Sequence, residues 1–378
     1  MGQYFGRDSG QVIMRVTFAI PSLGSGGAER VLTILANTWA SQGWEVTIIS
    51  LNNKDWDSFF EVDRRIRWVR LGLLKEAANP LSGLWNNIRR LQALRQAICQ
   101  SSPQVVISFI DTMNVLVLAA GRGLDIPVII SERSDPFKHP IGAVWNQLRR
   151  WTYPSASRLV VLSQAARAFF KALPGEKLCI IPNPILGVPA VAGETPFLAH
   201  RPVVLTAGRL SREKGCDLLI RAFATLSDRY PDWKLLILGE GPQRGELEAL
   251  VAQLGMEQRV SLPGRVKNPY DYYRKADLFV LPSRYEGLPN ALCEAMACGM
   301  AVVAANCSPG VAEVVRDGVN GLLAQPGNVD SLAAAMQQLM GDNARRASLG
   351  EQASLSSGPY QLNRVMALWE DLIRELTE

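Results

Sequence analysis

Short apolar runs rich in Val and Ile alternate with amphipathic segments along almost the whole chain, and this alternation limits the possible folds more than any other feature. In the first half, the apolar runs cover residues 15–20, 45–50, 104–109, 127–131 and 158–163. Runs that are apolar throughout are typical of parallel strands buried on both faces of a sheet. The segments between them, such as 26–42 and 84–100, place apolar residues at the spacings of amphipathic helices. The alternation predicts a doubly wound α/β fold.

A second series of strands follows a segment rich in proline and glycine, residues 181–202. Six further apolar runs cover residues 202–208, 233–239, 259–264, 278–283, 301–306 and 321–326. We therefore expect two Rossmann-like domains that face each other across a cleft, over residues 1–185 and 201–358, with a linker over 186–200. Ligands of such sheets bind beyond the carboxyl ends of the strands, so the cleft is the expected site.

The last segment, residues 359–378, has the spacing of an amphipathic helix. Its sequence places Val365, Leu368, Leu372 and Leu376 on one side. Packing of this side against the N-terminal domain is one arrangement, and periodicity alone does not choose it.

Composition excludes several classes of protein. With 378 residues, 48% hydrophobic, and a mean hydropathy of +0.05, the chain can bury two sizeable cores and is unlike a disordered or fibrous protein. The six cysteines form no Cys-x-x-Cys pair, and His139 and His200 are the only histidines. We therefore expect no metal site, no cofactor and reduced thiols in the cytoplasm.

No targeting signal is predicted at the start of the chain. No apolar run has the length of a transmembrane helix, and residues 1–14 lack the apolar core of a signal peptide. Gly2 would suit myristoylation, but Gly6 stands where that motif needs Ser or Thr. The first predicted strand begins directly after Met14, which makes Met14 a candidate natural start.

The positive charge is concentrated in the first half of the chain. Residues 1–185 contain 21 Lys and Arg against 13 Asp and Glu, a net charge of +8, whereas residues 186–378 contain 19 against 22, a net charge of −3. This asymmetry suits an anionic substrate or surface, or it serves only solubility. We expect no nucleic-acid partner.

Two loops that follow predicted strands have features of phosphate binding. In PSLGSGGAERV, Gly26 and Gly27 open a helix, where backbone N–H groups can approach a phosphate. A plain tight turn is the alternative, and the Walker pattern is absent. In TAGRLSREKG, Arg209 and Lys214 combine a planar fork with a point charge, which suits a diphosphate. Two solvated cations are the alternative.

The loop LGEGPQRG resembles part of a dinucleotide-binding fingerprint. Gly239 and Gly241 fit it, but Gly245 comes one residue late, which argues against a nicotinamide dehydrogenase. Pro242 is predicted to start the following helix.

The stretch SRYEGLPNALCEAMACGM contains a pair of glutamates, Glu286 and Glu294. On one continuous helix they would lie roughly 80° apart around the axis. Gly287 and Pro289 instead predict that Glu286 lies on a loop and Glu294 inside a helix that begins at Pro289. The free N–H groups at that helix start would form an anion site. Two solvated glutamates are the alternative.

In this order, Arg209 and Lys214, the LGEGPQR loop and the Glu286-to-Glu294 segment resemble the retaining nucleotide-sugar glycosyltransferases of family four (glycosyl transferases group 1), which have the GT-B fold. The resemblance extends from the glycine turn to NGLLAQPGN and is more specific in the second domain. It implies a metal-independent enzyme that moves a hexose or N-acetylhexosamine from a UDP- or GDP-sugar to a glycan acceptor, here expected to be lipid-linked. A catalytically inactive nucleotide-sugar-binding protein of the same fold is the alternative.

The same resemblance implies roles for individual residues. Arg209 and Lys214 would hold the donor diphosphate and stabilise the leaving group. Glu286 would bind the donor sugar and Glu294 the ribose, so the two glutamates would not form the acid–base pair of a glycosidase. The backbone around Arg265 and Val266 would hold the nucleobase, and the other donor-binding positions would be Gly26, Gly27, Gly241, Gly287 and Leu288. Asp55 and Asp57 formally match a metal-binding Asp-x-Asp but lie away from the motifs.

One position departs from the family pattern. Many members carry a histidine after a late strand of the first domain, where this chain has Glu132 and Arg133. We expect Arg133 to take that place on the acceptor side, with Glu132 beside it and His139 six residues beyond Arg133. In an alternative reading, Arg133 binds an anionic acceptor such as a diphosphate.

Two segments of the first domain combine aromatic and basic residues, which suits peripheral binding to an anionic membrane at the inner face of the plasma membrane. Core tryptophans among solvated arginines are the alternative. The residues are Trp85, Trp145, Trp151, Tyr153, Arg89, Arg90, Arg95, Arg149 and Arg150.

Overall fold

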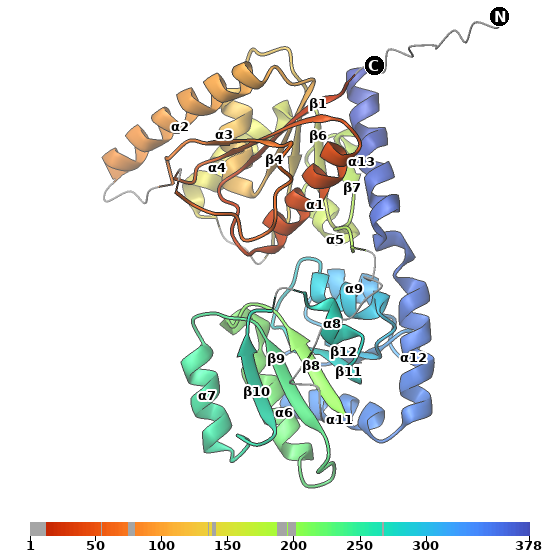
Figure 1. The fold of residues 1–378 in the computed structure, drawn as a ribbon. Coiled ribbons are helices and arrows are strands. Elements are labelled where there is room, and N and C mark those ends of the chain that lie inside the picture. Colours follow the sequence, from red (N-terminus) through yellow and green to blue (C-terminus); the bar gives the residue numbers. More distant parts are fainter. Residues whose placement is uncertain are drawn as a thin grey trace, which may run out of the picture.

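The computed structural model describes residues 13–53, 55–74, 80–134, 136–137, 141–186, 195, 202–266 and 268–378. It contains two parallel sheets, each flanked by helices (Figure 1). We call the part that contains β1–β7 the N-terminal domain and the part that contains β8–β13 the C-terminal domain. The doubly wound α/β prediction is confirmed. His139, His200 and Gly2 lie outside the described residues.

Seven parallel strands form the sheet of the N-terminal domain, in the order β3-β2-β1-β4-β5-β6-β7. The elements are β1 (Arg15–Ile20), α1 (Gly27–Ser41), β2 (Glu45–Ser50), β3 (Arg67–Arg70), α2 (Pro80–Ser101), β4 (Val105–Phe109), α3 (Asp111–Ala120), β5 (Val128–Ser131), α4 (Ala143–Thr152), β6 (Arg158–Val161), α5 (Gln164–Phe169) and β7 (Leu178–Ile180). All five strands predicted in this half are present. The edge strands β3 and β7 were not predicted, because RWVR carries two charges and LCI is only three residues long.

The C-terminal domain has six parallel strands in the order β10-β9-β8-β11-β12-β13. Its elements are β8 (Val203–Ala207), η4 (Arg212–Lys214), α6 (Cys216–Leu226), β9 (Lys234–Leu238), α7 (Arg244–Gln253), β10 (Val260–Gly264), α8 (Tyr270–Tyr273), β11 (Leu278–Leu281), α9 (Asn290–Ala297), β12 (Val302–Ala305), α10 (Pro309–Val314), β13 (Leu322–Ala324), α11 (Val329–Met340) and α12 (Asn343–Ser356). Each of the six predicted runs is a strand. Pro242 does not start a helix, since it lies in a turn and α7 begins at Arg244.

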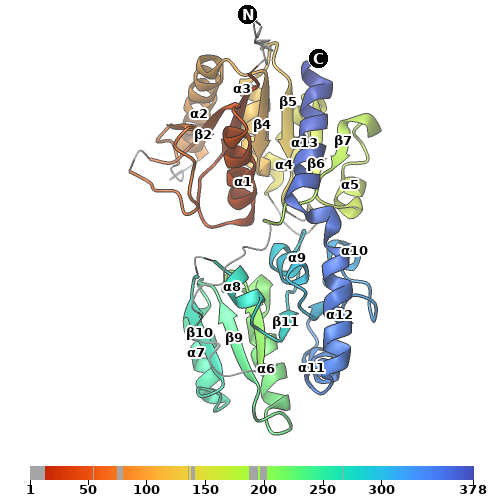
Figure 2. The same cartoon turned by 45° about the vertical axis from the view of Figure 1, so that its right-hand side comes forward.

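The chain crosses between the domains twice. β7 ends at Ile180 and β8 begins at Val203, and most of the predicted linker, 186–200, lies outside the described residues, so its bounds stay a prediction. The second crossing leads from α12 to α13 (Leu362–Thr377), which lies along the N-terminal domain (Figure 2).

Helix α13 contributes Val365, Trp369 and Ile373 to the core that also contains Phe18 and Phe109. Of the predicted apolar side, Val365 and Leu372 are buried and Leu376 packs against this core, whereas Leu368 is 43% exposed and its neighbour Trp369 is fully buried. The large indole ring occupies the position facing the sheet, and this contact defines the buried side.

Both sheets reverse their strand order next to their first strand, between β1 and β4 in one domain and between β8 and β11 in the other. Such switch points leave a crevice at the carboxyl ends of the strands. In the described part of the chain, no helix combines the length and apolar character needed to span a bilayer.

Candidate active site

A cleft of about 1030 Å³ lies between the two domains. Loops that follow β1, β2, β4, β5 and β7 form one wall, and loops that follow β8, β9, β10 and β11 form the other. Every predicted site residue except Glu132 lines this cleft: Gly26, Gly27, Arg133, Arg209, Lys214, Gly241, Arg265, Val266, Glu286, Gly287, Leu288 and Glu294. The fold thus brings together residues that lie up to 268 positions apart in the sequence, from Gly26 to Glu294.

Lys214 and Glu286 form an ion pair at the floor of the cleft. The Lys214 ammonium donates to Glu286 Oε1 at 2.7 Å, and the Ser283 hydroxyl donates to the same oxygen at 2.7 Å. Burial acts to lower the pKa of Lys214, but the Glu286 carboxylate outweighs it and the pKa is raised. Lys214 therefore keeps its positive charge inside the cleft at neutral pH.

Arg209 is a second cation on the same loop. Its side chain is exposed in the cleft and makes no hydrogen bond or ion pair with the described part of the chain. A free guanidinium beside the half-buried Lys214 ammonium provides two donor groups for an anionic ligand. Lys214 is paired with Glu286, whereas the Arg209 side chain has no ion-pair partner in the described part of the chain.

Glu294 is paired across the cleft with a residue that the sequence analysis missed. Its Oε1 lies 2.6 Å from Arg30 Nη1, on α1 of the opposite domain. Burial raises the pKa of Glu294, while Arg30 acts to lower it. The helix of Glu294 begins at Asn290, one residue after the predicted start, with Pro289 at its N-cap. Arg30 could have been noticed, because a cation in the first turn of a helix opposes the helix dipole.

Two of the predicted glycines are explained by close packing of the chain. A Cβ atom at Gly27 would lie 3.1 Å from Asn290 Nδ2, so the domains approach each other here. A Cβ atom at Gly241 would clash with the carbonyl oxygen of Leu210. Gly241 also lines the cleft, but its close contact with the Leu210 loop is enough to explain why this position has no side chain.

Arg133 lines the N-terminal wall of the cleft, and its Nε and Nη2 atoms are buried. Its Nη1 donates to Asn183 Oδ1 at 2.8 Å, and Asn183 Nδ2 donates to Asn290 Oδ1 at 2.6 Å. Its Nε and Nη2 atoms have no hydrogen-bond partner in the described ranges. The guanidinium lies over the rings of Phe109 and Trp369, 4.8 and 5.6 Å from their centres. Burial lowers the pKa of Arg133.

Glu132 points away from the cleft, and its predicted place on the acceptor side is corrected. The side chain is 3% exposed and accepts a hydrogen bond from the Tyr153 hydroxyl. Burial raises its pKa to about 7. Successive side chains after a strand leave on opposite sides, so Arg133 enters the cleft while Glu132 enters the core.

Asp55 and Asp57 are exposed and do not line the cleft. The described ranges hold no cluster of three or more His, Cys, Asp or Glu side chains that is arranged to bind a metal ion. The Asp-x-Asp motif therefore has no supporting geometry.

The aromatic and basic residues predicted to contact a membrane differ in their exposure to solvent. Trp85 and Trp151 are 58% and 70% exposed, and Arg89, Arg95 and Arg150 are exposed as well. Trp145 and Arg90 are half-buried, and Tyr153 and Arg149 are buried.

Solved structures with the same arrangement of two domains define the class of this protein. Sucrose-phosphate synthase from Thermosynechococcus elongatus is similar with a TM-score of 0.79 and 20% identity over 96% of this chain and 99% of that one. HepE from Anabaena, in complex with UDP, has a TM-score of 0.77 and 20% identity over 96% of this chain and 100% of its own. The fold is GT-B.

The chain belongs to the glycosyl transferases group 1 family, whose model matches residues 193–355, and residues 26–184 match a glycosyl transferase 4-like domain. It is a glycosyltransferase of the retaining class. A relative from Campylobacter jejuni is 30% identical over 96% of this chain and 99% of its own length; it is the GalNAc-alpha-(1->4)-GalNAc-alpha-(1->3)-diNAcBac-PP-undecaprenol alpha-1,4-N-acetyl-D-galactosaminyltransferase. An uncharacterized glycosyltransferase from Haemophilus influenzae is 27% identical over 95% of this chain and 99% of its own length.

Proposed function

We propose that this glycosyltransferase moves a hexose or N-acetylhexosamine from a UDP- or GDP-sugar to a lipid-linked glycan during the assembly of a polysaccharide or glycoconjugate. The observation that carries the proposal is the Lys214–Glu286 pair beside the free Arg209 guanidinium, on the cleft floor. Two cations next to a carboxylate match a donor with a diphosphate on one side and sugar hydroxyls on the other.

In this proposal the cations stabilise charge that develops as the bond between the sugar and the diphosphate breaks. Arg209 and Lys214 face the diphosphate oxygens, whose negative charge grows in the transition state, and such preorganised donors lower the barrier. Glu286 accepts hydrogen bonds from the sugar hydroxyls while its Oε1 also accepts one from Lys214. The acceptor hydroxyl attacks from the face that the nucleotide leaves, and the leaving phosphate takes its proton.

Relatives support the choice of donor and acceptor. HepE was solved with UDP and with UDP-glucose. Two Campylobacter jejuni relatives, both 30% identical to this chain, are N-acetylgalactosaminyltransferases acting on undecaprenol-linked diphosphates. We therefore place UDP-GalNAc first among the donors and an undecaprenyl-diphosphate glycan first among the acceptors.

A panel of donors tests this function directly. UDP-GalNAc, UDP-GlcNAc, UDP-glucose, UDP-galactose and GDP-mannose are each incubated with the protein and a lipid-linked acceptor, and nucleotide release is measured. Proton NMR of the product then reports whether the anomeric configuration is retained. Thermal stabilisation by a nucleotide without turnover of any donor would instead support the catalytically inactive binding protein.

Arg133 is proposed to hold an anionic part of the acceptor, such as its diphosphate. Its two unpartnered donors and its place in the cleft support this role. The Arg133→Ala variant should raise the acceptor KM while leaving the affinity for UDP unchanged. Unchanged acceptor KM and kcat would exclude the role.

The exposed face of α2 and α4 is proposed to rest on the cytoplasmic face of an anionic plasma membrane. Trp85 and Trp151 with Arg89 and Arg150 combine apolar and basic groups on helices that pack against α3. The Trp85→Ser, Trp151→Ser double variant should lose co-sedimentation with liposomes that contain anionic lipid, while Trp56→Ser, a change at another exposed tryptophan, should keep it. Absence of wild-type binding at low salt would contradict this proposal.

A further inference from the structure

Two phenylalanines of the N-terminal domain, Phe59 and Phe60, line the cleft opposite the backbone predicted to hold the nucleobase. They lie on the loop between β2 and β3. Their rings are nearly perpendicular, at 86°, with centres 5.0 Å apart, and Phe59 is 47% exposed. Exposed aromatic rings that face a ligand cleft are suited to contact with a planar apolar group.

The opposite wall contributes a cation to this end of the cleft. Arg265 follows β10 of the C-terminal domain, and its guanidinium carbon lies 5.5 Å from the centre of the Phe59 ring. Val266 lines the cleft next to it. A flat guanidinium, an aromatic ring and an aliphatic side chain thus surround the same space, in which a base is able to stack.

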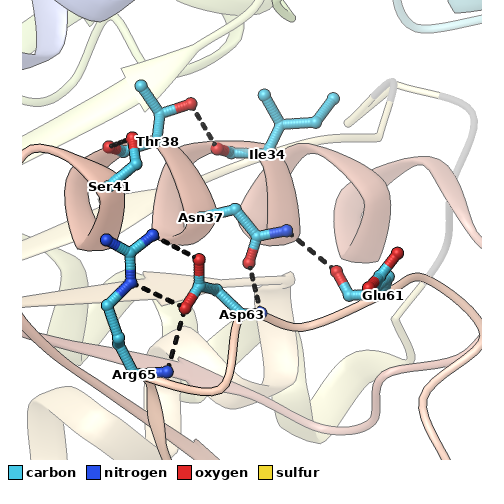
Figure 3. A network of polar contacts seen from close by, with 7 residues as sticks. All are labelled: Ile34, Asn37, Thr38, Ser41, Glu61, Asp63 and Arg65. Carbon is cyan, nitrogen blue, oxygen red and sulfur yellow. Dashed lines mark hydrogen bonds and ion pairs between the residues drawn. The ribbon is translucent and has the colours of Figure 1, made fainter.

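Hydrogen bonds fasten the loop that carries the two rings to the N-terminal domain on both sides of them, and Figure 3 shows those on the side beyond Phe60. The backbone N–H of Phe59 donates to the Leu23 carbonyl at 3.1 Å. Beyond Phe60, the Asn37 side chain on α1 donates to the Glu61 carbonyl at 2.8 Å and accepts from the Asp63 N–H at 2.9 Å. The loop backbone that carries the rings is therefore fastened to the loop after β1 and to α1.

The other end of α1 carries groups of the same cleft. Gly27 begins this helix, and Arg30 on its first turn reaches Glu294 of the other domain. Helix α1 thus contacts both the glycine turn and the aromatic loop, and both segments line the same wall of the cleft.

We propose that Phe59 and Phe60 form the N-terminal domain's half of the nucleobase pocket and stack on the base of the donor. This inference rests on the proposed nucleotide-sugar donor and adds an apolar contact to a site whose other groups bind phosphate and hydroxyls. In this arrangement the base stacks beside the Phe59 ring and the Arg265 guanidinium, and the diphosphate lies toward Arg209 and Lys214. Stacking of a base on an aromatic side chain changes affinity by on the order of ten-fold or more.

Calorimetric titration of UDP, GDP and inorganic diphosphate separates the base from the phosphates. The Phe59→Ala, Phe60→Ala double variant should bind the wild type's preferred nucleotide about ten-fold more weakly, with unchanged affinity for inorganic diphosphate. Phe59→Tyr keeps a ring and should retain nucleotide affinity, whereas Phe59→Leu should not. Trp56→Ala is the matched control, since Trp56 is on the same loop and 46% exposed but does not line the cleft.

Two results would overturn the inference while leaving the proposed function intact. One is a double variant whose nucleotide affinity stays within two-fold of wild type. The other is an equal loss of affinity for diphosphate, which would assign the loop a merely structural role. A wild-type protein that binds neither UDP nor GDP would overturn the proposed function itself, and this inference with it.

Discussion

Arg30 and Glu294 join the two domains through an ion pair whose atoms lie 2.6 Å apart. Arg30 is on the first turn of α1 and Glu294 is inside α9, so the pair links the glycine turn of one domain to the helix predicted to bind the ribose. The carboxylate is 4% exposed, and a carboxylate buried so deeply needs a partner to stay ionised.

Replacement of Arg30 should therefore make nucleotide binding dependent on pH. In Arg30→Met the pKa of Glu294 is expected to rise further, because burial remains and the opposing cation is gone. A larger fraction of Glu294 is then protonated than in the wild type, and UDP affinity should fall by roughly 3- to 10-fold at pH 7 and recover as the pH rises. Titrations of UDP from pH 6 to 9 measure this. Arg30→Lys is the control, and a variant with the wild-type pH profile would show that Arg30 does not set the charge of Glu294.

Replacement of Glu294 should affect the affinity for UDP, and replacement of Glu286 should affect kcat. Glu294→Ala is expected to weaken binding of free UDP, because it removes the ribose acceptor, while Glu286→Ala is expected mainly to lower kcat with the sugar donor. Calorimetry with UDP and steady-state kinetics separate the two effects. Equal UDP affinity of Glu294→Ala and wild type would contradict the ribose assignment.

Arg209→Ala should lower kcat by about 10²- to 10³-fold, because it removes a donor that faces charge developed in the transition state. Arg212→Ala is a matched control on the same loop, since Arg212 is exposed but does not line the cleft. Turnover of the preferred donor measures both. A similar loss in the two variants would point to an effect on the loop and not on the diphosphate.

Trp369→Ala should destabilise the N-terminal domain by roughly 3–5 kcal/mol, as expected when a large buried aromatic side chain is removed. The neighbouring Leu368→Ala should change stability by less than about 0.5 kcal/mol, because Leu368 is largely on the surface. Hydrogen exchange of β1 and β4 amides reports the local effect. Equal protection in both variants would show that α13 is not part of this core.

Ionisation of the buried Glu132 carboxyl group should lower the free energy of unfolding as the pH rises through neutrality. Its pKa is raised from the model-compound value of 4.5 to about 7 by burial, so the folded state binds a proton more tightly than the unfolded state. This tighter proton binding contributes its full stabilisation of the folded state below about pH 4.5, and the contribution is lost as the pH rises to 7. Glu132→Gln cannot ionise and should exceed wild type in stability at pH 8 by on the order of 1–3 kcal/mol, with little difference at pH 4.5. Chemical denaturation at the two pH values measures the free energy of unfolding of both proteins. A difference between variant and wild type that does not depend on pH would refute the role of ionisation.

Most of the sheet could be predicted, because central parallel strands are buried on both faces and read as continuous apolar runs. Edge strands such as β3 meet solvent and carry polar residues, so they lack this signal. Three of the four residues predicted for the apolar side of α13 lie in the core or pack against it, but Leu368 was expected there and its neighbour Trp369 was not. Helical spacing allows neighbouring faces, and only the partner surface selects one.

The charged donor residues could be predicted because their loops follow strands in one domain and combine recognisable residue types. Arg30 gave only a weak signal, as a cation in the first turn of a helix, and Asn183 and the Phe59–Phe60 pair gave none, since the importance of all of them arises from the opposite wall of the cleft. Glu132 was misplaced because its sequence neighbour Arg133 enters the cleft, and the direction in which each side chain leaves the strand end is a property of the folded chain.

The last helix of the chain also has a consequence for how the protein is made. Domains of a long chain generally fold in the order in which they are synthesised. Here the core around Phe18 and Phe109 includes Val365 and Trp369, so the domain that leaves the ribosome first cannot complete its interior until the final residues emerge. The C-terminal domain, whose strands end at Ala324, therefore has all its strands available before the N-terminal domain is closed. A nascent chain that stops before Leu362 would display aromatic core surface to the chaperones that receive it.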